Sequence, residues 1–221
     1  MPRARCRLHI LMAQTAPVAL ILRRGPSAWY HLIRWNTRAD TFEHGAWFKG
    51  RIYEERCDLS PDGSLFLYFA LQGSRFRSTY AGAWTAVSRT PWLHALALWP
   101  QGHTWGGGGR FLGDREVALH MANGSPTHPD HPAHGLDVTY GRRGTFRETD
   151  FGPDDWVGED QAGEKIRARG GKLFRTRDGE EVELADWNDL TPDPQPPPGR
   201  AKELLRPVRK KPRSRGGGSA S

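Results

Sequence analysis

The sequence predicts a mainly β protein, with antiparallel hairpins in a single domain and a propeller-like or sandwich-like arrangement of sheets. The 221 residues include 26 Gly and 17 Pro, which interrupt the chain too often for long helices. Short runs of aliphatic, aromatic and β-branched residues lie between these breaks, as is typical of strands. Two sequences typical of tight turns also occur, Ser60-Pro61-Asp62-Gly63 and Arg177-Asp178-Gly179-Glu180.

The first predicted strand is Val18–Leu22, which ends at the turn residues Arg23-Arg24-Gly25-Pro26. Trp29–Trp35 and Thr41–Lys49 are predicted to pair as a hairpin, because a short polar turn separates them. Leu65–Leu71 follows the Ser-Pro-Asp-Gly turn at once. Its unbroken apolar character predicts a strand buried on both faces.

The second half of the chain gives weaker patterns. Four further strands are predicted, at Trp84–Arg89, Glu116–Met121, Lys172–Thr176 and Glu181–Ala185. Pro91–Trp99 fits either a helix or a short buried strand. Residues 123–135 are a loop rich in Gly, Pro and His, and residues 150–170 are acidic and polar, with room for one short helix.

Composition divides the chain into three parts. Residues 1–17 are interpreted as an N-terminal extension, with Met12 as an alternative start. Residues 18–190 form the β-rich globular domain, and residues 191–221 form a Pro-rich, basic tail that is predicted to be disordered. The apolar run that begins at Leu8 is too short and too polar for a transmembrane segment, and its flanks argue against a signal peptide. Two cysteines suit a reducing compartment, so a cytoplasmic location is predicted.

The net charge of +7 belongs to one end of the chain. Residues 200–221 contain eight basic residues and one acidic residue, so the remainder of the chain is neutral. A basic tail without aromatic residues predicts weak, non-specific nucleic-acid contact through residues 200–215. The domain itself offers no electrostatic argument for a nucleic-acid partner.

The hairpins and the Ser-Pro-Asp-Gly turn resemble the blades of β-propellers, and the domain is long enough for four small blades. The chain also resembles an uncharacterised bacterial family of about 200 residues. The segments that carry this resemblance are Arg23–Ser27, Trp29–Leu32, Cys57–Gly63, Ala97–Pro100, Trp105–Gly109 and Leu184–Asp189. The resemblance implies a domain that starts near Met12, and it implies no catalytic residues.

Three histidines form the clearest candidate metal site. His128, His131 and His134 lie three residues apart, and three imidazoles can hold Zn²⁺ with a fourth position open to water. Prolines between them exclude a helix, so a common face does not follow from the spacing. A solvated loop is the alternative interpretation, and no cofactor is predicted beyond this possible zinc ion.

The candidate ligand-binding residues centre on a run of four glycines. The set consists of Trp92, Trp105, Gly106, Gly107, Gly108, Gly109 and Arg110. Backbone N–H groups of the glycines could hold an anion, and a Trp in a turn-rich context is a candidate for exposure. The alternative is a chain crossing where no side chain fits.

No catalytic set stands out from the residues. Cys57 precedes an acid, which raises a thiol pKa, and Glu54 and Glu55 are interpreted as a solvated face. The first functional hypothesis is therefore a non-catalytic binding or interaction module with an unknown protein or small-molecule ligand, rather than an enzyme. The alternatives are a metal-binding protein or metal-dependent hydrolase that uses the histidine loop, and a nucleic-acid-associated protein that uses the tail.

Overall fold

A computed structural model describes residues 6–73, 82–122, 124–141 and 155–207. The protein is mainly β, with 49% strand and 4% helix, which confirms the predicted fold class. Within the described residues the strands form four sheets, all antiparallel except for one parallel pair, β11 with β12. None of the described helices is long and apolar enough to cross a membrane.

The chain builds its sheets one after another. Sheet A contains β1 (Arg7–Met12), β2 (Val18–Arg24), β3 (Trp29–Asn36) and β4 (Thr41–Lys49). Sheet B contains β5 (Arg51–Ile52), β6 (Asp58–Leu59), β7 (Leu65–Leu71), β8 (Ala83–Arg89) and β9 (Ala95–Pro100), with the 3-10 turn η1 (Glu54–Arg56) between β5 and β6. Sheet C contains β10 (Gly109–Phe111), β11 (Glu116–Leu119) and β12 (Asp137–Tyr140). Sheet D contains β13 (Asp155–Glu159), β14 (Lys165–Arg169), β15 (Lys172–Arg177) and β16 (Glu180–Asp186).

The sheets pack face to face through three hydrophobic clusters, which join A with B, A with D, and B with C. Sheet A is therefore covered on both faces. Along β2, Leu20 and Leu22 enter the cluster with sheet B, whereas Ala19 and Ile21 enter the cluster with sheet D. This alternation is the two-residue period of a strand, and it explains why a fully apolar run forms a strand here.

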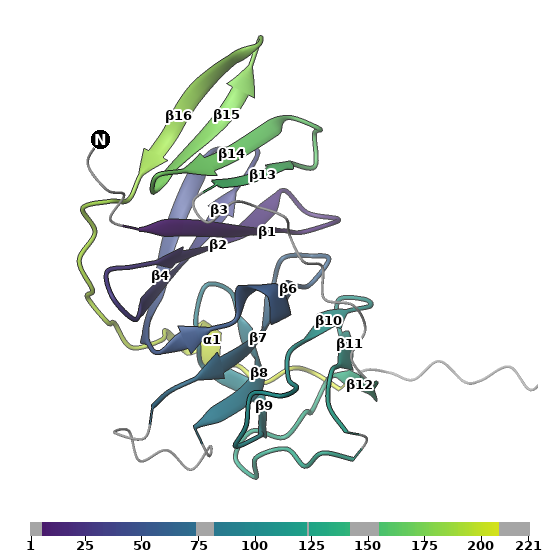
Figure 1. Ribbon diagram of the computed structural model, residues 1–221. Coiled ribbons are helices and arrows are strands. Elements are labelled where there is room, and N and C mark those ends of the chain that lie inside the picture. The colour runs from purple at the N-terminus through teal and green to yellow at the C-terminus, as the bar shows by residue number, and fades with distance from the viewer. Residues whose placement is uncertain (1–5, 74–81, 123, 142–154, 208–221) are drawn as a thin grey trace, which may run out of the picture.

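The same reasoning applies to β7, where the prediction of a strand buried on both faces is confirmed. Phe66, Tyr68 and Ala70 pack toward sheet A, and Leu65 and Leu67 pack toward sheet C. Sheet B is thus the second inner layer of the arrangement. Figure 1 shows sheet D at the top, sheet A below it, then sheet B, with sheet C beside sheet B.

The strands β1, β6, β10 and β13, one from each sheet, lie on the same side of the molecule (Figure 1). β1 contacts both β13 and β6, and β6 contacts β10. Each sheet extends from this side, its inner edge, in chain order. The arrangement is therefore a series of four packed sheets rather than a sandwich of two sheets.

Both predicted turns form. In Ser60-Pro61-Asp62-Gly63 the Gly63 N–H donates to the Ser60 carbonyl at 2.8 Å, and Gly63 has a φ of 72°. In the second hairpin Asp178 and Gly179 have φ values of 50° and 83°, as a two-residue type I′ turn requires. These local signals fixed the hairpin registers because the turn residues are the ones that tolerate positive φ.

Two expectations about the strands were wrong. Residues 7–12 are not an extension outside the fold: they form β1, whose Leu8 and Ile10 are buried against sheet D. Residues 155–169 form β13 and β14 rather than a short helix. The alternation of inward and outward side chains in these short strands is hidden by their charged outer positions.

The tail begins later than predicted. Residues 199–202 form the short helix α1 against β8, and Ala201 and Leu205 are buried. Two apolar side chains thus hold the start of the tail on the body. Residues 208–221, which carry most of the predicted basic tail, lie outside the described residues.

The segment Pro91–Trp99, for which the sequence allowed either a helix or a short strand, contributes to the strand β9.

Candidate functional site

A cleft opens where the inner edges of sheets A, B and D meet, and we call it the central cleft. Its volume is about 390 Å³. It is lined by His9, Ile10, Leu11, Met12, Gln14, Glu54, Glu55, Cys57, Asp58 and Trp156. β1 supplies one wall, η1 and β6 supply the opposite wall, and Trp156 of β13 also belongs to the lining. A concave site of this size that combines apolar and polar groups suits a small ligand.

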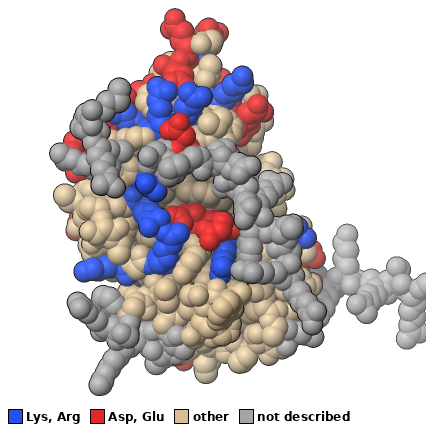
Figure 2. All heavy atoms as spheres, in the orientation of Figure 1, with Lys and Arg blue, Asp and Glu red and all other residues tan. Residues whose placement is uncertain are grey.

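The charge of the lining is one-sided. Three carboxylates line the central cleft, from Glu54, Glu55 and Asp58, and the lining contains no Lys or Arg. Figure 2 shows an acidic patch in the hollow at the middle of this face, with basic side chains beside it. Outside the basic tail the chain has equal numbers of basic and acidic residues, so the acidic lining does not simply follow from the composition.

The three carboxylates differ in how fully they are engaged. Both oxygens of Asp58 accept backbone N–H groups, from Leu59 at 3.0 Å and from Phe111 at 2.7 Å, so Asp58 joins sheet C to sheet B. Glu54 accepts a hydrogen bond from the Tyr30 hydroxyl at 2.8 Å. The second oxygen of Glu54 pairs with Arg51 at 3.4 Å. Among the described residues Glu55 has one long ion pair, 3.9 Å, with Arg56, so Glu55 is the carboxylate best placed to receive a ligand.

His9 is the one imidazole in the cleft. Burial lowers its pKa, and the neighbouring Glu54 only partly opposes this effect. At neutral pH the ring is therefore uncharged, and the lining keeps the negative charge of its carboxylates. No hydrogen bond or ion pair is recorded for the His9 side chain with the described residues, so its ring nitrogens remain open to a ligand.

Cys57 lines the cleft but is not arranged as a nucleophile. Burial raises the pKa of its thiol well above the usual value; a backbone hydrogen bond at Phe69 partly opposes this, and the acids at Glu54, Glu55 and Asp58 add to the increase. The thiol donates to the Tyr53 carbonyl at 3.2 Å. A thiol that stays protonated and bonded to backbone is a packing group, as its sequence context predicts.

Two N–H groups of the predicted glycine run are bonded within the protein. The Gly107 N–H donates to the His120 carbonyl at 2.9 Å, and the Gly108 N–H donates to the Thr85 hydroxyl at 2.8 Å. A Cβ at Gly108 would lie 2.2 Å from the Arg56 carbonyl oxygen. The glycines are thus needed where the chain crosses close to η1, which is the alternative interpretation of this segment.

The remaining predicted ligand residues are separated. Trp105 is 85% exposed, and Arg110 is exposed on β10. Trp92 lies in a different cavity, together with Arg34, Arg89 and Arg200. The set therefore does not form one site, although Trp92 does line a pocket.

The histidine loop pairs with the edge strand β9. The His128 N–H donates to the Leu98 carbonyl at 2.8 Å, and the Leu98 N–H donates to the His131 carbonyl at 3.1 Å. The rings of His128 and His131 lie 5.6 Å apart, and His94 lies 6.1 Å from His131. Among the described residues, no group of three or more metal-ligating side chains is placed to hold an ion, so His134 does not complete a triad here. The zinc hypothesis stays a prediction.

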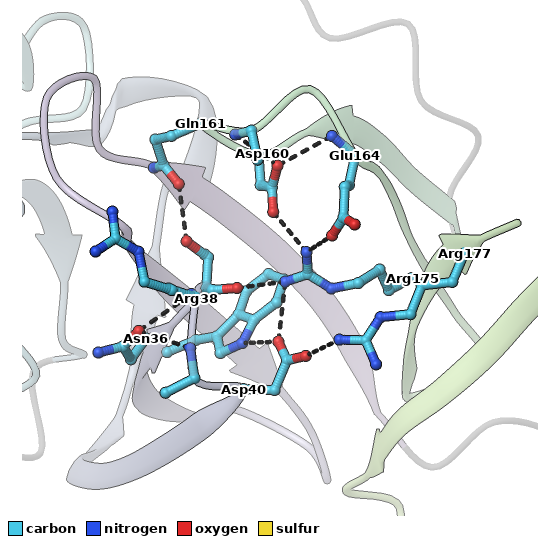
Figure 3. Close-up of polar contacts among 12 residues, drawn as sticks. Asn36, Arg38, Asp40, Asp160, Gln161, Glu164, Arg175 and Arg177 are labelled. Atoms are coloured by element: carbon cyan, nitrogen blue, oxygen red, sulfur yellow. Dashed lines mark hydrogen bonds and ion pairs between the residues drawn. The ribbon is translucent and has the colours of Figure 1, made fainter.

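A second charged cluster lies between sheets A and D (Figure 3). Arg175 of β15 donates to Asp160 at 2.6 Å, to Asp40 at 2.9 Å and to the Thr37 carbonyl at 2.6 Å. It also pairs with Glu164, and its guanidinium lies 5.3 Å from the Trp35 ring centroid. Arg175 is only 2% exposed, so this cluster joins two sheets and offers no open position to a ligand.

A buried histidine gives the fold an acid-sensitive stability. His31 stacks on Trp47 at 4.2 Å, and burial lowers its pKa to about 4. Between pH 6.5 and 4 the unfolded chain binds a proton that the folded chain does not, so acidification costs about 3 kcal/mol at this residue. Urea unfolding at pH 7.5, 6.5, 5.5 and 4.5 should show stability falling across this window.

The matched variants are His31→Phe and His103→Ala. His31→Phe should be less stable at pH 7.5, because Ala46 loses its hydrogen-bond donor, but its stability should fall less with acidification. The exposed His103→Ala variant should keep the pH dependence of the original chain. An unchanged slope in His31→Phe would contradict the assignment.

Sequence reasoning missed every titratable residue of the central cleft. From the sequence, Glu54 and Glu55 were interpreted as part of a solvent-exposed face. His9 lay in the segment that was assigned to an N-terminal extension. One signal was present: in Arg7–Met12 the buried Leu8 and Ile10 alternate with His9 and Leu11, as in a half-buried strand. Nothing local indicated that this strand would face η1.

Comparison of the chain with protein-family models, with curated proteins and with solved structures found no match.

Proposed function

We propose that this protein is a non-catalytic binding module that holds a small cationic ligand with an apolar part in its central cleft. The observation that carries the proposal is the lining itself, with three carboxylates, a neutral imidazole and no Lys or Arg. Because opposite charge attracts more strongly in a partly desolvated cleft than in water, such a lining favours cations over anions.

The apolar part of the ligand is indicated by the other walls. Leu11, Met12 and the indole of Trp156 lie beside the carboxylates. An ammonium or amidinium group could pair with Glu55, next to the negative charge of Glu54, while its hydrocarbon part lies against these side chains. Binding without catalysis is favoured because Cys57 and Asp58 already have structural partners.

Titration calorimetry with three probes of one shape tests this proposal. Benzamidine, benzamide and benzoate carry a positive charge, no charge and a negative charge on the same ring. We expect saturable binding of benzamidine at the cleft and no saturation there by the other two. In Glu54→Gln/Glu55→Gln the affinity should fall at least about tenfold, since hydrogen bonds to charged groups are worth about 1.5–3 kcal/mol.

The control is Glu180→Gln, which removes one exposed carboxylate from β16 at a distance from the inner edge. It should leave the affinity for benzamidine unchanged. Gln retains the acceptor for the Tyr30 hydroxyl, so the double variant should fold, and an unfolding curve would verify this. Equal binding of all three probes, or equal loss in the control, would contradict a cation site.

A further inference from the structure

A second cavity lies away from the central cleft, between the start of the tail and sheets A and B. We call it the Trp92 pocket. Its volume is about 280 Å³, and its lining consists of Arg34, Glu43, Ser64, Arg89, Thr90, Trp92, Arg200, Ala201 and Glu203. β3 and β4 supply one side, the end of β8 and the following turn supply the floor, and α1 closes the other side. None of these residues lines the central cleft.

The charge of this pocket is the reverse of that of the cleft. Three arginines line it against two glutamates. Arg200 pairs with Glu43, whereas Arg89 donates to the backbone carbonyl of Glu203 at 3.2 and 3.3 Å and so keeps its charge unneutralised. For Arg34 no ion pair or side-chain hydrogen bond is recorded with the described residues. Two guanidinium groups therefore face the cavity without a carboxylate partner.

One residue of the pocket lining carries a buried donor without a partner. The Trp92 Nε1 has no hydrogen-bond partner among the described residues, although it is buried. Since a buried donor without an acceptor costs about 1–3 kcal/mol, a site that contains such a donor gains by receiving an acceptor.

We propose that the Trp92 pocket binds the phosphate group of a small phosphate monoester, with the organic part of the ester against the Trp92 indole. The arginines Arg34 and Arg89 supply planar, forked donors, which match the geometry of phosphate oxygens. The indole supplies an apolar surface and one further donor. This proposal does not depend on the ligand of the central cleft.

The test uses the full chain, because residues 200–203 form one wall of the pocket. Phenyl phosphate, inorganic phosphate and benzamidine are titrated by calorimetry, and the indole N–H signals are followed by NMR. We expect one phenyl phosphate per chain, an affinity that falls with added salt, and at least about tenfold weaker binding of inorganic phosphate. The indole signal that disappears in Trp92→Phe should move on binding.

Three variants distinguish binding at the Trp92 pocket from non-specific attraction of phosphate to basic residues. Arg34→Gln should weaken phenyl phosphate binding by about tenfold or more, because it removes a charged donor that has no structural partner. Trp92→Phe, which retains an aromatic surface, should weaken it less. Arg38→Gln, at an exposed arginine of the β3–β4 turn, should have no effect.

Three results would overturn the proposal. One is the absence of saturable phenyl phosphate binding to the folded chain. Another is an equal loss in Arg34→Gln and Arg38→Gln, which would indicate non-specific attraction. Equal affinity for phenyl phosphate and inorganic phosphate would overturn the assignment of an ester. Benzamidine binding that survives in Arg34→Gln, with phenyl phosphate binding lost, would show that the two sites are separate.

Discussion

Arg175→Ala is expected to destabilise the protein by about 3–5 kcal/mol, because removing one partner of a buried ion pair leaves the other partner charged and unpaired. Asp160 has a side chain only 3% exposed, and it would lose its 2.6 Å contact with the guanidinium. Thr37 would lose the donor to its carbonyl, and Trp35 the cation above its ring. Urea unfolding at pH 7.5 measures the change.

Arg177→Ala is the matched control for this prediction. Arg177 pairs with the same Asp40 at 2.8 Å, but its side chain is 50% exposed. Exposed ion pairs contribute about 0–1 kcal/mol, so this variant should stay close to the original stability. Similar losses in both variants would contradict the view that Arg175 joins sheet D to sheet A (Figure 3).

Gly108→Ala is expected to cost about 3 kcal/mol, because steric overlap and a disfavoured backbone conformation act together. The new Cβ would lie 2.2 Å from the Arg56 carbonyl oxygen, and the residue has a φ of 76°. The overlap is with backbone, so no side chain can turn away to relieve it. Urea unfolding measures the loss.

Gly113→Ala tests whether any glycine near sheet C has this effect. The atom nearest to a new Cβ at Gly113 would be the Glu116 Cβ, at 3.7 Å, which is an ordinary van der Waals contact. We expect a change within about 0.5 kcal/mol. If Gly108→Ala also falls within that range, the glycine run is not required for the chain crossing, and the ligand interpretation of the run would be open again.

The elements that the sequence predicted well carry their signal within a few residues. Leu65–Leu71 is apolar at every position because both of its faces are buried, and Asp178-Gly179 adopts the positive φ values that its residue types favour. Thr41–Lys49 forms β4 with the predicted bounds. In each case the local pattern and the tertiary environment agree, so the prediction did not depend on knowing the neighbours.

The elements that were missed depend on neighbours far along the chain. β14 buries only Ile166 and Ala168, and its other residues are charged or exposed, so its pattern is too short to separate from a polar loop. β1 was excluded because the first residues looked like an extension, yet Leu8 and Ile10 pack against Trp156 and Ile166. These contacts exist only once sheet D has folded onto sheet A.

The candidate sites were missed for the same reason. The central cleft brings together β1, η1 and β13, which lie up to about 150 residues apart, and each contributes one or two polar residues that look ordinary alone. Trp92 was identified because its turn-rich context suggested exposure, but its arginine neighbours come from β3, β8 and the tail. Convergence of this kind has no local sequence signature.

The most direct test of the cation-binding cleft is a crystal structure of the full chain with benzamidine. The proposal predicts the amidinium within hydrogen-bonding distance of Glu54 or Glu55, with the phenyl ring against Trp156. It would be contradicted if benzamidine occupied only another part of the molecule, such as the Trp92 pocket or the exposed surface, while the central cleft held no ligand.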